Sequence, residues 1–297
     1  MKNRQKALFA ILLSGILGGG NAVFNKLGLK EIPSFLFIFL RFLITAIMLW
    51  PFFSKKLLKL NSNLRNLFLI SVLPVINIIL FAYGVQRTSA NIATIIYTST
   101  PITVAILSGI ILKETFKAKR IAGVIFGFFG TGLIILLPIF EKKAALQSDL
   151  LGNSAIFLGM IFFSFYNVLS KKFHDQYSPV FITFIFAVTA MLMTFLFAGK
   201  DLMSPAIWQK VTFSGWIGLL YVGVFGSIAL YLLFQYAVKY GTPLIGSMNS
   251  YLQPISGVIW AALILGEKVT PIFIVGSLIT IVGVYLVTAK PDENKTV

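Results

Sequence analysis

The second half of this chain repeats its first half, at an offset of 153 residues over the best-matched stretch. An internal repeat of this size indicates one structural unit used twice. Both copies are apolar enough to lie in a bilayer, so we expect one membrane body made of two related units, residues 1–145 and 146–297. Five residues recur with their type unchanged: Tyr83/Tyr236, Pro101/Pro254, Glu114/Glu267, Gly123/Gly276 and Gly130/Gly283.

The composition predicts an all-α integral membrane protein. Of 297 residues, 58% are hydrophobic and only 11% are charged, with a mean hydropathy of +0.91, whereas soluble domains carry about 25% charged residues. The absence of cysteine removes disulfides, thiolate metal sites and cysteine nucleophiles, and we expect no cofactor and no metal. The net charge of +16 comes mostly from short segments between apolar runs, which indicates membrane topology and no nucleic-acid partner.

A helix needs about 20 mostly apolar residues to cross the hydrocarbon core, and ten such segments fit this chain. The basic N-terminus precedes an apolar run that we interpret as a retained first span, because it lacks a small-residue cleavage site. Pro follows a capping side chain at the start of three spans, at residues 178–179, 242–243 and 270–271. The predicted spans are 7–27, 33–53, 67–87, 91–112, 119–139, 151–171, 179–199, 214–238, 243–265 and 271–289.

Ten spans place both termini on the same side of the membrane. Sixteen Lys and Arg residues fall on that side against eight on the other, so the positive-inside rule predicts cytoplasmic termini in a multi-pass protein of the cell membrane. Each half holds five spans, an odd number, so the two repeats must be inverted relative to each other. Inverted halves can exchange roles between inward-open and outward-open states, with the substrate between them near the midplane.

The fourth and ninth spans carry repeat-related polar stripes. Tyr97, Thr98 and Pro101 follow one another at helical spacing, and Tyr251 and Pro254 occupy the same stripe in the second copy. Because a mid-span proline frees a backbone carbonyl, these stripes are expected to face protein or water, with the two prolines as kinks in gating helices. The alternative interpretation is that small and hydroxylated residues only allow close helix packing.

Further polar side chains lie inside predicted spans. An amide in hydrocarbon costs several kcal/mol without a partner, so these side chains are expected to face the interior. Asn21 and Asn25 in the first span align with Tyr166 and Ser170 at an offset of 145, which implies an eight-residue insertion later in the second half. The remaining candidates for binding a substrate are Asn77, Asn167, Tyr231, Gln235, Asn249 and Gln253.

Three charged residues are candidates for a functional role. Arg41 is the charged residue well inside a predicted span, and it would either neutralise an anionic substrate group or snorkel and bind backbone carbonyls. Glu114 and Glu267 close the fourth and ninth spans, 13 residues after each repeat proline. Each glutamate would either pair with a basic residue of the opposite half or stabilise the start of the following helix.

The arrangement of titratable residues argues against catalysis. None of the nine acidic residues falls in the middle of a predicted span, which disfavours obligatory coupling to protons or sodium ions. The sole histidine, His174, falls in a predicted cytoplasmic loop. The sequence contains no nucleophile–base pair, metal-ligand motif or Walker motif, so we expect a protein that is not an enzyme.

These residues resemble the EamA-like ten-span carriers of the drug/metabolite transporter superfamily. The resemblance covers essentially the whole chain and rests on two patterns in register: Pro101, Lys113-Glu114, Gly123 and Gly130, then Pro254, Gly266-Glu267, Gly276 and Gly283. It implies inverted repeats around a cavity lined by spans one, three, four, six, eight and nine, and export of small metabolites such as amino acids. Lys113 stands where the family usually has glycine.

We therefore expect a secondary transporter of small organic solutes that works by alternating access. The low charge of the predicted cavity favours neutral, zwitterionic or amphipathic substrates. An uncoupled facilitator or channel-like pathway is the alternative, and a lipid-handling membrane enzyme is a weaker one because no catalytic residue can be nominated. The expected partners are a small-molecule substrate and the lipid bilayer, and the sequence leaves the oligomeric state open.

Overall fold

The computed structural model describes residues 2–52, 62–85, 87, 96–140, 150–265 and 271–288, and contains helices and no strand within these ranges. The described part of the first half contains α1 (Lys2–Leu29), α2 (Ser34–Leu49), the short 3-10 helix η1 (Trp50–Phe52), α3 (Ser62–Val85), α5 (Thr100–Ile111) and α6 (Ala118–Phe140). The second half contains α7 (Leu150–Ser170), α8 (Pro179–Leu202), α9 (Pro205–Trp208), α10 (Phe213–Tyr221), the π-helix η4 (Val222–Ala229), α11 (Leu230–Tyr240), α12 (Pro243–Ser247), α13 (Asn249–Leu265) and α14 (Pro271–Thr288).

Each predicted span corresponds to a helix or to a short series of helices. The eighth span is the continuous run α10–η4–α11, and the ninth is α12 followed by α13. Two predicted caps are confirmed: Ser178 Oγ accepts from the Phe181 N–H, and Thr242 Oγ1 accepts from the Ile245 N–H, both at 3.2 Å. The third capping position, Thr270, lies outside the described residues.

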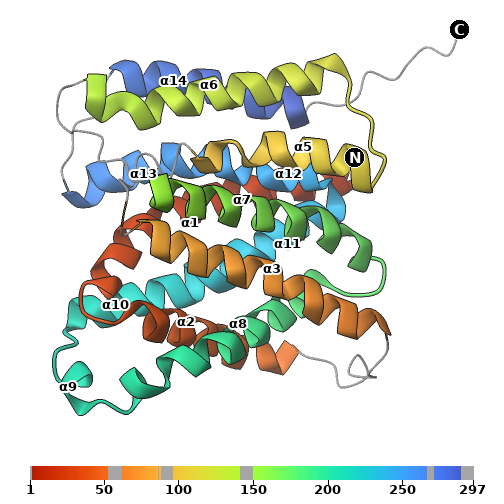
Figure 1. The fold of residues 1–297 in the computed structure, drawn as a ribbon. Helices are drawn as coiled ribbons and strands as arrows, with labels where there is room; N and C mark the ends of the chain where they lie inside the picture. Colours follow the sequence, from red (N-terminus) through yellow and green to blue (C-terminus); the bar gives the residue numbers. More distant parts are fainter. Residues whose placement is uncertain are drawn as a thin grey trace, which may run out of the picture.

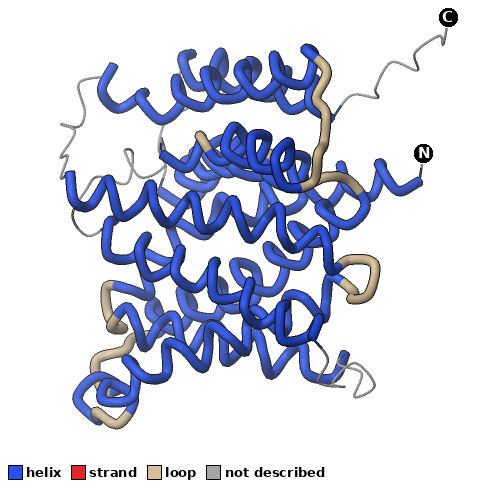
Figure 2. The backbone as a smooth tube through the Cα atoms, turned by 45° about the vertical axis from the view of Figure 1, so that its right-hand side comes forward, coloured by secondary structure: helices blue, strands red, loops and turns tan. Residues whose placement is uncertain are grey.

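Six described helices are long and apolar enough to cross a membrane by length and composition. Two shorter apolar helices, Ile96–Ile111 and Ile274–Thr288, accompany them. In Figure 2 the helices run between two faces at which the loops gather, as expected for a bundle that spans a bilayer. The six spans are Gln5–Leu29, Ser34–Phe52, Asn63–Gly84, Leu150–Phe173, Pro179–Leu202 and Phe213–Tyr240.

The two halves are interleaved and do not stand side by side as separate bundles. α1 packs against α10, α11 and α13, and its repeat counterpart α7 packs against α3 and α5. The two sets of contacts are equivalent under the repeat. α3 is the counterpart of the eighth span, which contains α10 and α11, and α5 is the counterpart of the ninth span, which contains α13. α6 pairs with α14 at the top of Figure 1, and α2 pairs with α8 at the bottom. The all-α fold with inverted repeats is therefore present.

The α6–α14 pair shows the inverted symmetry residue by residue. A Cβ atom added at Gly123 would lie 2.7 Å from the Gly283 carbonyl oxygen, and one added at Gly130 would lie 2.8 Å from that of Gly276. Gly276 is the repeat counterpart of Gly123, and Gly283 is that of Gly130. Each α6 glycine therefore contacts the counterpart of the other α6 glycine, as an antiparallel two-fold arrangement requires. Small residues at these crossings allow the two backbones to approach closely.

The predicted eight-residue insertion lies in α8. α2 has 16 residues and α8 has 24, a difference of eight. The two helices start 145 residues apart, at residues 34 and 179, and end 153 residues apart, at residues 49 and 202. The repeats are related by an offset of 145 residues before the insertion and 153 residues after it. The eight extra residues therefore lie within α8 and lengthen this helix.

Several spans are interrupted near the middle of the bundle. The chain turns at Ser99 before α5 and at Met248 between α12 and α13. Pro101 therefore lies in the first turn of a helix, where its missing N–H costs nothing, whereas Pro254 lies inside α13. In the third span Pro74 lies inside α3, and its counterpart at the 153-residue offset, Ser227, lies in the π-helix. The matching places thus hold a proline within a continuous α-helix in the first copy and a π-helix in the second.

The glycine crossings provide a stability test with an internal control. Gly130→Val places a branched side chain against the backbone of Thr280, 2.6 Å from its nitrogen, whereas no atom lies within 4 Å of a Cβ at Gly132. We expect Gly130→Val to destabilise the purified protein by about 1–3 kcal/mol through overpacking. The thermal unfolding midpoint in detergent should fall for Gly130→Val and stay near wild type for Gly132→Val. Equal midpoints for the two variants would contradict close α6–α14 packing.

Candidate functional site

Four spans bring polar side chains together around Tyr231 on α11. Tyr231 lies close enough to Arg41, Tyr97 and Tyr166 to interact with each of them electrostatically. These neighbours come from α2, from the helical residues 96–98 that precede the turn before α5, and from α7, so both halves of the protein contribute. Tyr97 and Tyr231 are each only partly buried and keep some accessible surface.

Arg41 is held inside the bundle, in the middle of α2. Its side chain is 8% exposed, and its Nε donates a hydrogen bond of 2.9 Å to Ser227 Oγ in the π-helix. The Ser227 hydroxyl donates in turn to the Val222 carbonyl at 3.0 Å. The guanidinium carbon lies 4.9 Å from the centre of the Phe42 ring, a cation–π distance. Arg41 therefore connects the two halves and does not snorkel to the membrane surface.

Asn77 and Tyr97 form a polar pair within the first half. The Asn77 side-chain nitrogen donates a hydrogen bond to the Tyr97 hydroxyl oxygen. This bond joins α3 to the interrupted fourth span, and it leaves the Tyr97 hydroxyl hydrogen available for another acceptor. The edge of the Phe81 ring packs against Tyr97, with ring centres 5.4 Å apart. The buried Thr98 lies next to this pair in the chain.

A second hydrogen-bond network, within the second half, is fully buried. Gln235 Nε2 donates to the Tyr166 hydroxyl at 2.9 Å, and Gln235 Oε1 lies 3.0 Å from His174 Nε2. His174 is 5% exposed although it follows the last turn of the α7 span. Burial, together with the charges of Lys171 and Lys239, lowers the pKa of His174 from its usual value of 6.5 to about 3. His174 is therefore neutral and joins α7 to α11.

The amides and the tyrosine of the ninth span lie elsewhere. Ser14 Oγ donates to Asn249 Oδ1 at 3.0 Å, and a Cβ at Gly18 would lie 2.9 Å from the Gln253 side chain, so both amides lie at the contact between α1 and α13. Tyr251 is fully buried, and its hydroxyl donates to the Val124 carbonyl at 2.8 Å. The structure therefore brings Asn77, Tyr97, Tyr231 and Gln235 together. It places Asn249 and Gln253 between α13 and α1, and Tyr251 between α13 and α6.

Asn167 on α7 is a buried amide without a partner. Both polar atoms of its side chain are buried and make no hydrogen bond to any described residue. It faces α12, because a Cβ added at Gly246 would lie 3.6 Å from its Oδ1. An unpaired buried polar group costs about 1–3 kcal/mol, so this amide is free to bind a ligand or to bond differently in another state.

Glu114 lies in the linker between α5 and α6, next to basic residues of both halves. Its Oε2 is buried and makes no hydrogen bond to a described residue. Burial raises the pKa of Glu114, and the charges of Lys171 in the second half and Arg120 on α6 oppose that effect. Lys171 Nζ donates to the carbonyls of Val238, Lys239 and Gly241, at 2.9–3.1 Å, and so caps the end of α11. Glu267 lies outside the described residues.

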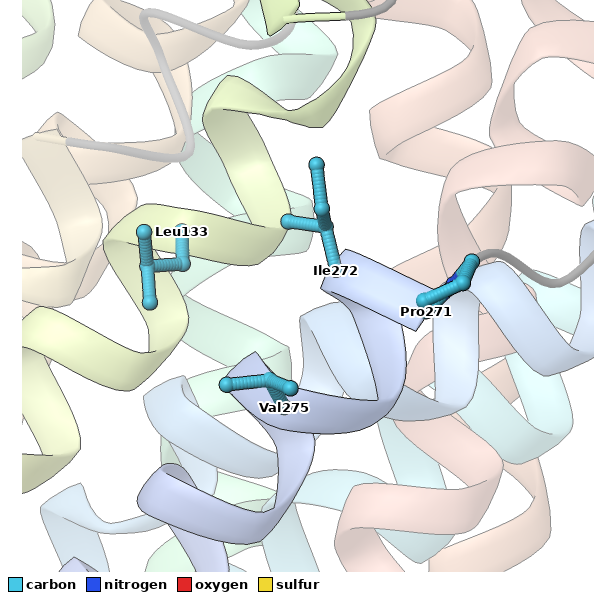
Figure 3. Close-up of a pocket in the computed structure, with 4 residues that line it drawn as sticks. All are labelled: Leu133, Pro271, Ile272 and Val275. Atoms are coloured by element: carbon cyan, nitrogen blue, oxygen red, sulfur yellow. The ribbon is translucent and has the colours of Figure 1, made fainter.

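The pocket shown in Figure 3 is apolar and lies away from these groups. It has a volume of about 340 Å³ and is lined by Leu133 of α6 and by Pro271, Ile272 and Val275 of α14. Ile272 and Val275 are exposed on this helix pair, so the pocket opens onto the outer surface of the bundle, where we expect lipid tails. We therefore place the candidate site at the group formed by Arg41, Asn77, Tyr97, Tyr166 and Tyr231, which we call the Tyr231 cluster. The described residues contain no group of three or more residues able to hold a metal ion.

The sequence did not single out four residues in or next to these polar groups. Phe42 and Phe186 are fully buried beside Tyr231, but 29 phenylalanines in the chain gave no signal that singled them out. Ser227 looked like an ordinary small residue, and His174 was expected in a loop. The alignment of the third and eighth spans was the available signal, because it pairs Ser227 with Pro74.

Comparison with known proteins gives a consistent match over both halves. The EamA-like transporter family matches residues 5–136 and 150–289. An uncharacterized transporter of Archaeoglobus fulgidus is 27% identical over 97% of this chain and 99% of its own length. A chloroplastic WAT1-related protein of Arabidopsis thaliana is 24% identical over 95% of this chain and 73% of its own length. One crystal structure shares the fold, with a TM-score of 0.77, 18% identity and coverage of 96% and 98% of the two chains.

The buried His174 predicts a specific acid sensitivity. Its folded pKa of about 3 lies below the usual 6.5, so between these values the unfolded chain binds a proton that the folded chain does not. This contribution to stability is therefore complete above pH 6.5 and decreases as the pH falls toward 3. The thermal midpoint of wild type should drop more between pH 7.5 and 5 than that of His174→Gln. Glu114 titrates in both proteins, so equal drops would contradict a neutral buried His174.

The end of α5 provides a second prediction. Lys113 has a φ of 56°, the left-handed conformation that glycine adopts without strain and that costs other residues about 1–2 kcal/mol. The backbone N–H groups of Leu112 and Glu114 both donate to the Ser108 carbonyl at this turn. Lys113→Gly should therefore raise the free energy of unfolding by about 1 kcal/mol, measured by thermal unfolding, while Lys117→Gly in the same linker should not. A lower midpoint for Lys113→Gly would contradict strain at this position.

Proposed function

This chain belongs to the EamA-like transporter family, and we propose that it is a secondary transporter that carries small organic metabolites, such as amino acids, outward across the cell membrane. Its relatives are transporters and not enzymes, so the polar cluster is best interpreted as a binding site without catalysis. The observation that carries the proposal is a group of hydrogen-bonding side chains from both halves around a buried arginine that has no described counterion. Ionisable side chains inside a membrane are costly and mark substrate pathways.

The inverted halves support alternating access. Related halves of opposite orientation adopt two states of similar energy, and rocking between them opens a central site to either side. In this proposal each moving unit combines helices of both repeats, because α1 packs against α10, α11 and α13 and α7 packs against α3 and α5. Both termini lie in the cytoplasm. The turns at Ser99 and Met248 and the π-helix interrupt the regular helices where the halves meet, and interruptions of this kind absorb changes in backbone angle.

The candidate residues have several roles in this proposal. Asn77, Tyr97 and Tyr231 supply hydrogen bonds to the substrate, and Asn167 adds an unpaired amide on the neighbouring α7. Gln235 positions Tyr166. A further group holds the interface that must open or slide: Thr98, Asn249, Tyr251, Gln253, Pro101 and Pro254. Glu114 and Lys171 approach each other from opposite halves, beyond the ends of their spans, and favour closure there.

Uncoupled facilitation is a second candidate mechanism. No described acidic residue lies in the middle of a span, and a carboxylate at that depth is the group that proton- and sodium-driven carriers commonly use. A facilitator would equilibrate its solute without an ion gradient. A carrier and a channel-like pathway differ in saturation and in exchange, and both properties are measurable.

Counterflow in proteoliposomes tests the proposal. Vesicles preloaded with a mixed pool of amino acids, nucleobases and sugars should take up a labelled solute by saturable exchange. Asn77→Leu should reduce this exchange by about tenfold or more, because it removes a hydrogen-bond donor and leaves Tyr97 without its partner. Asn63→Leu, near the start of α3 and outside the cluster, is the matched control and should exchange like wild type.

Two results would count against this function. A leak that does not saturate and shows no exchange would favour the channel-like pathway and contradict alternating access. Saturable exchange that is unchanged in Asn77→Leu would support a carrier but would move its binding site away from the Tyr231 cluster. Thermal unfolding of each variant separates lost exchange from lost folding.

A further inference from the structure

Arg41 is a positive charge inside the bundle that has no negative partner. No carboxylate of a described residue lies within ion-pair distance of it, and its electrostatic partner is the uncharged Tyr231. Its Nε bonds to Ser227, while its two terminal nitrogens make no hydrogen bond to any described residue. A buried cation without a counterion is strongly unfavourable, so a role in binding explains why the site carries a charge.

The groups around Arg41 are also short of hydrogen-bond acceptors. The Tyr231 hydroxyl makes no hydrogen bond to a described residue and keeps accessible surface. The Tyr97 oxygen already accepts from Asn77, which leaves its hydrogen to donate. A guanidinium is a donor only. A site with unused donors and one positive charge is complementary to a ligand group that only accepts and carries a negative charge.

We propose that Arg41, with Tyr231 and Tyr97, forms a binding site for the carboxylate of a small monoanionic or zwitterionic solute. A single guanidinium balances one negative charge, which favours a carboxylate over a doubly charged phosphate. The planar donors of a guanidinium also match the two carboxylate oxygens. This inference rests on the proposed transport function and adds the chemical group by which the substrate is recognised.

The site is asymmetric with respect to the repeat, because only one of two equivalent positions is charged. Arg41 is the eighth residue of α2, and the eighth residue of α8 is Phe186. Both flank Tyr231: Arg41 interacts with it electrostatically, and the Phe186 ring lies 4.7 Å from its ring centre, edge to face. Of these two equivalent positions near Tyr231, the first half therefore supplies a cation and the second half a fully buried hydrocarbon ring. Only the position in the first half can neutralise a charged group of a ligand.

Paired ligands that differ in the carboxylate alone test this site. The full-length protein in detergent is titrated with 3-phenylpropionate or 3-phenylpropionamide, and with phenylalanine or phenylalaninamide, while its thermal midpoint is followed. We expect at least one acid to bind about tenfold or more tightly than its amide, because the amide cannot neutralise Arg41. Arg41→Gln should abolish this preference, and Arg41→Lys should retain part of it.

Matched variants protect the test against misfolding. Arg65→Gln removes a positive charge from an exposed position of α3 and should keep the acid preference. Tyr231→Phe removes one hydroxyl, preserves the ring packing and should weaken acid binding several-fold, whereas Tyr285→Phe on the exposed face of α14 should not. Equal binding of acid and amide, no acid-specific shift in either pair, or an acid preference that persists in Arg41→Gln would overturn the site.

The counterflow assay separates failure of the site from failure of the transport function. Wild-type vesicles that exchange solutes saturably but show no acid preference would overturn the carboxylate site and leave the carrier intact. Acid-specific binding that depends on Arg41, in a protein that shows no exchange, would support the site and contradict transport.

Discussion

Hydrocarbon offers no hydrogen-bond partners, and this constraint governs the whole molecule. Backbone groups must be paired within each span, so the chain crosses the membrane as helices. Departures from regular helix are tolerated where protein surrounds them, and here the turn at Ser99, the turn at Met248 and the π-helix all lie where the two halves meet. The places where the backbone is hardest to satisfy are therefore also the places best suited to movement and to ligand binding.

The two copies of the inverted repeat share their helix-packing contacts more closely than they share their polar side chains. The glycines of α6 and α14 exchange places under the two-fold relation, and the contacts of α1 match those of α7. The side chains around Tyr231 do not exchange in this way, since Arg41 is matched by Phe186. Packing must be repeated because both copies face the same geometric problem. The polar residues are free to differ, because helix packing does not require the same charge in both copies.

Side chains also differ in whether their hydrogen bonds are already used. Gln235 is satisfied by Tyr166 and His174, and Tyr251 by the Val124 carbonyl, so both contribute to packing. Asn167 lacks any described partner, and Arg41 uses only part of its hydrogen-bonding capacity. Burial alone does not separate these classes, since Gln235 and Asn167 are both fully buried. The two classes differ in whether the side chain already has hydrogen-bond partners.

The sequence by itself determined the ten spans and the inversion, because hydropathy is a local property and the inversion follows from an odd number of spans in each repeat. It showed that the glycines of α6 and α14 recur, but only the structure showed that they meet. The sequence also supplied most of the polar side chains as candidates. Only the tertiary structure decided that Tyr231 and Arg41 lie together while Asn249 and Tyr251 pack elsewhere, and that His174 is buried. Helical spacing fixes which residues share a face of one helix, but the partner of that face depends on how distant spans pack against one another.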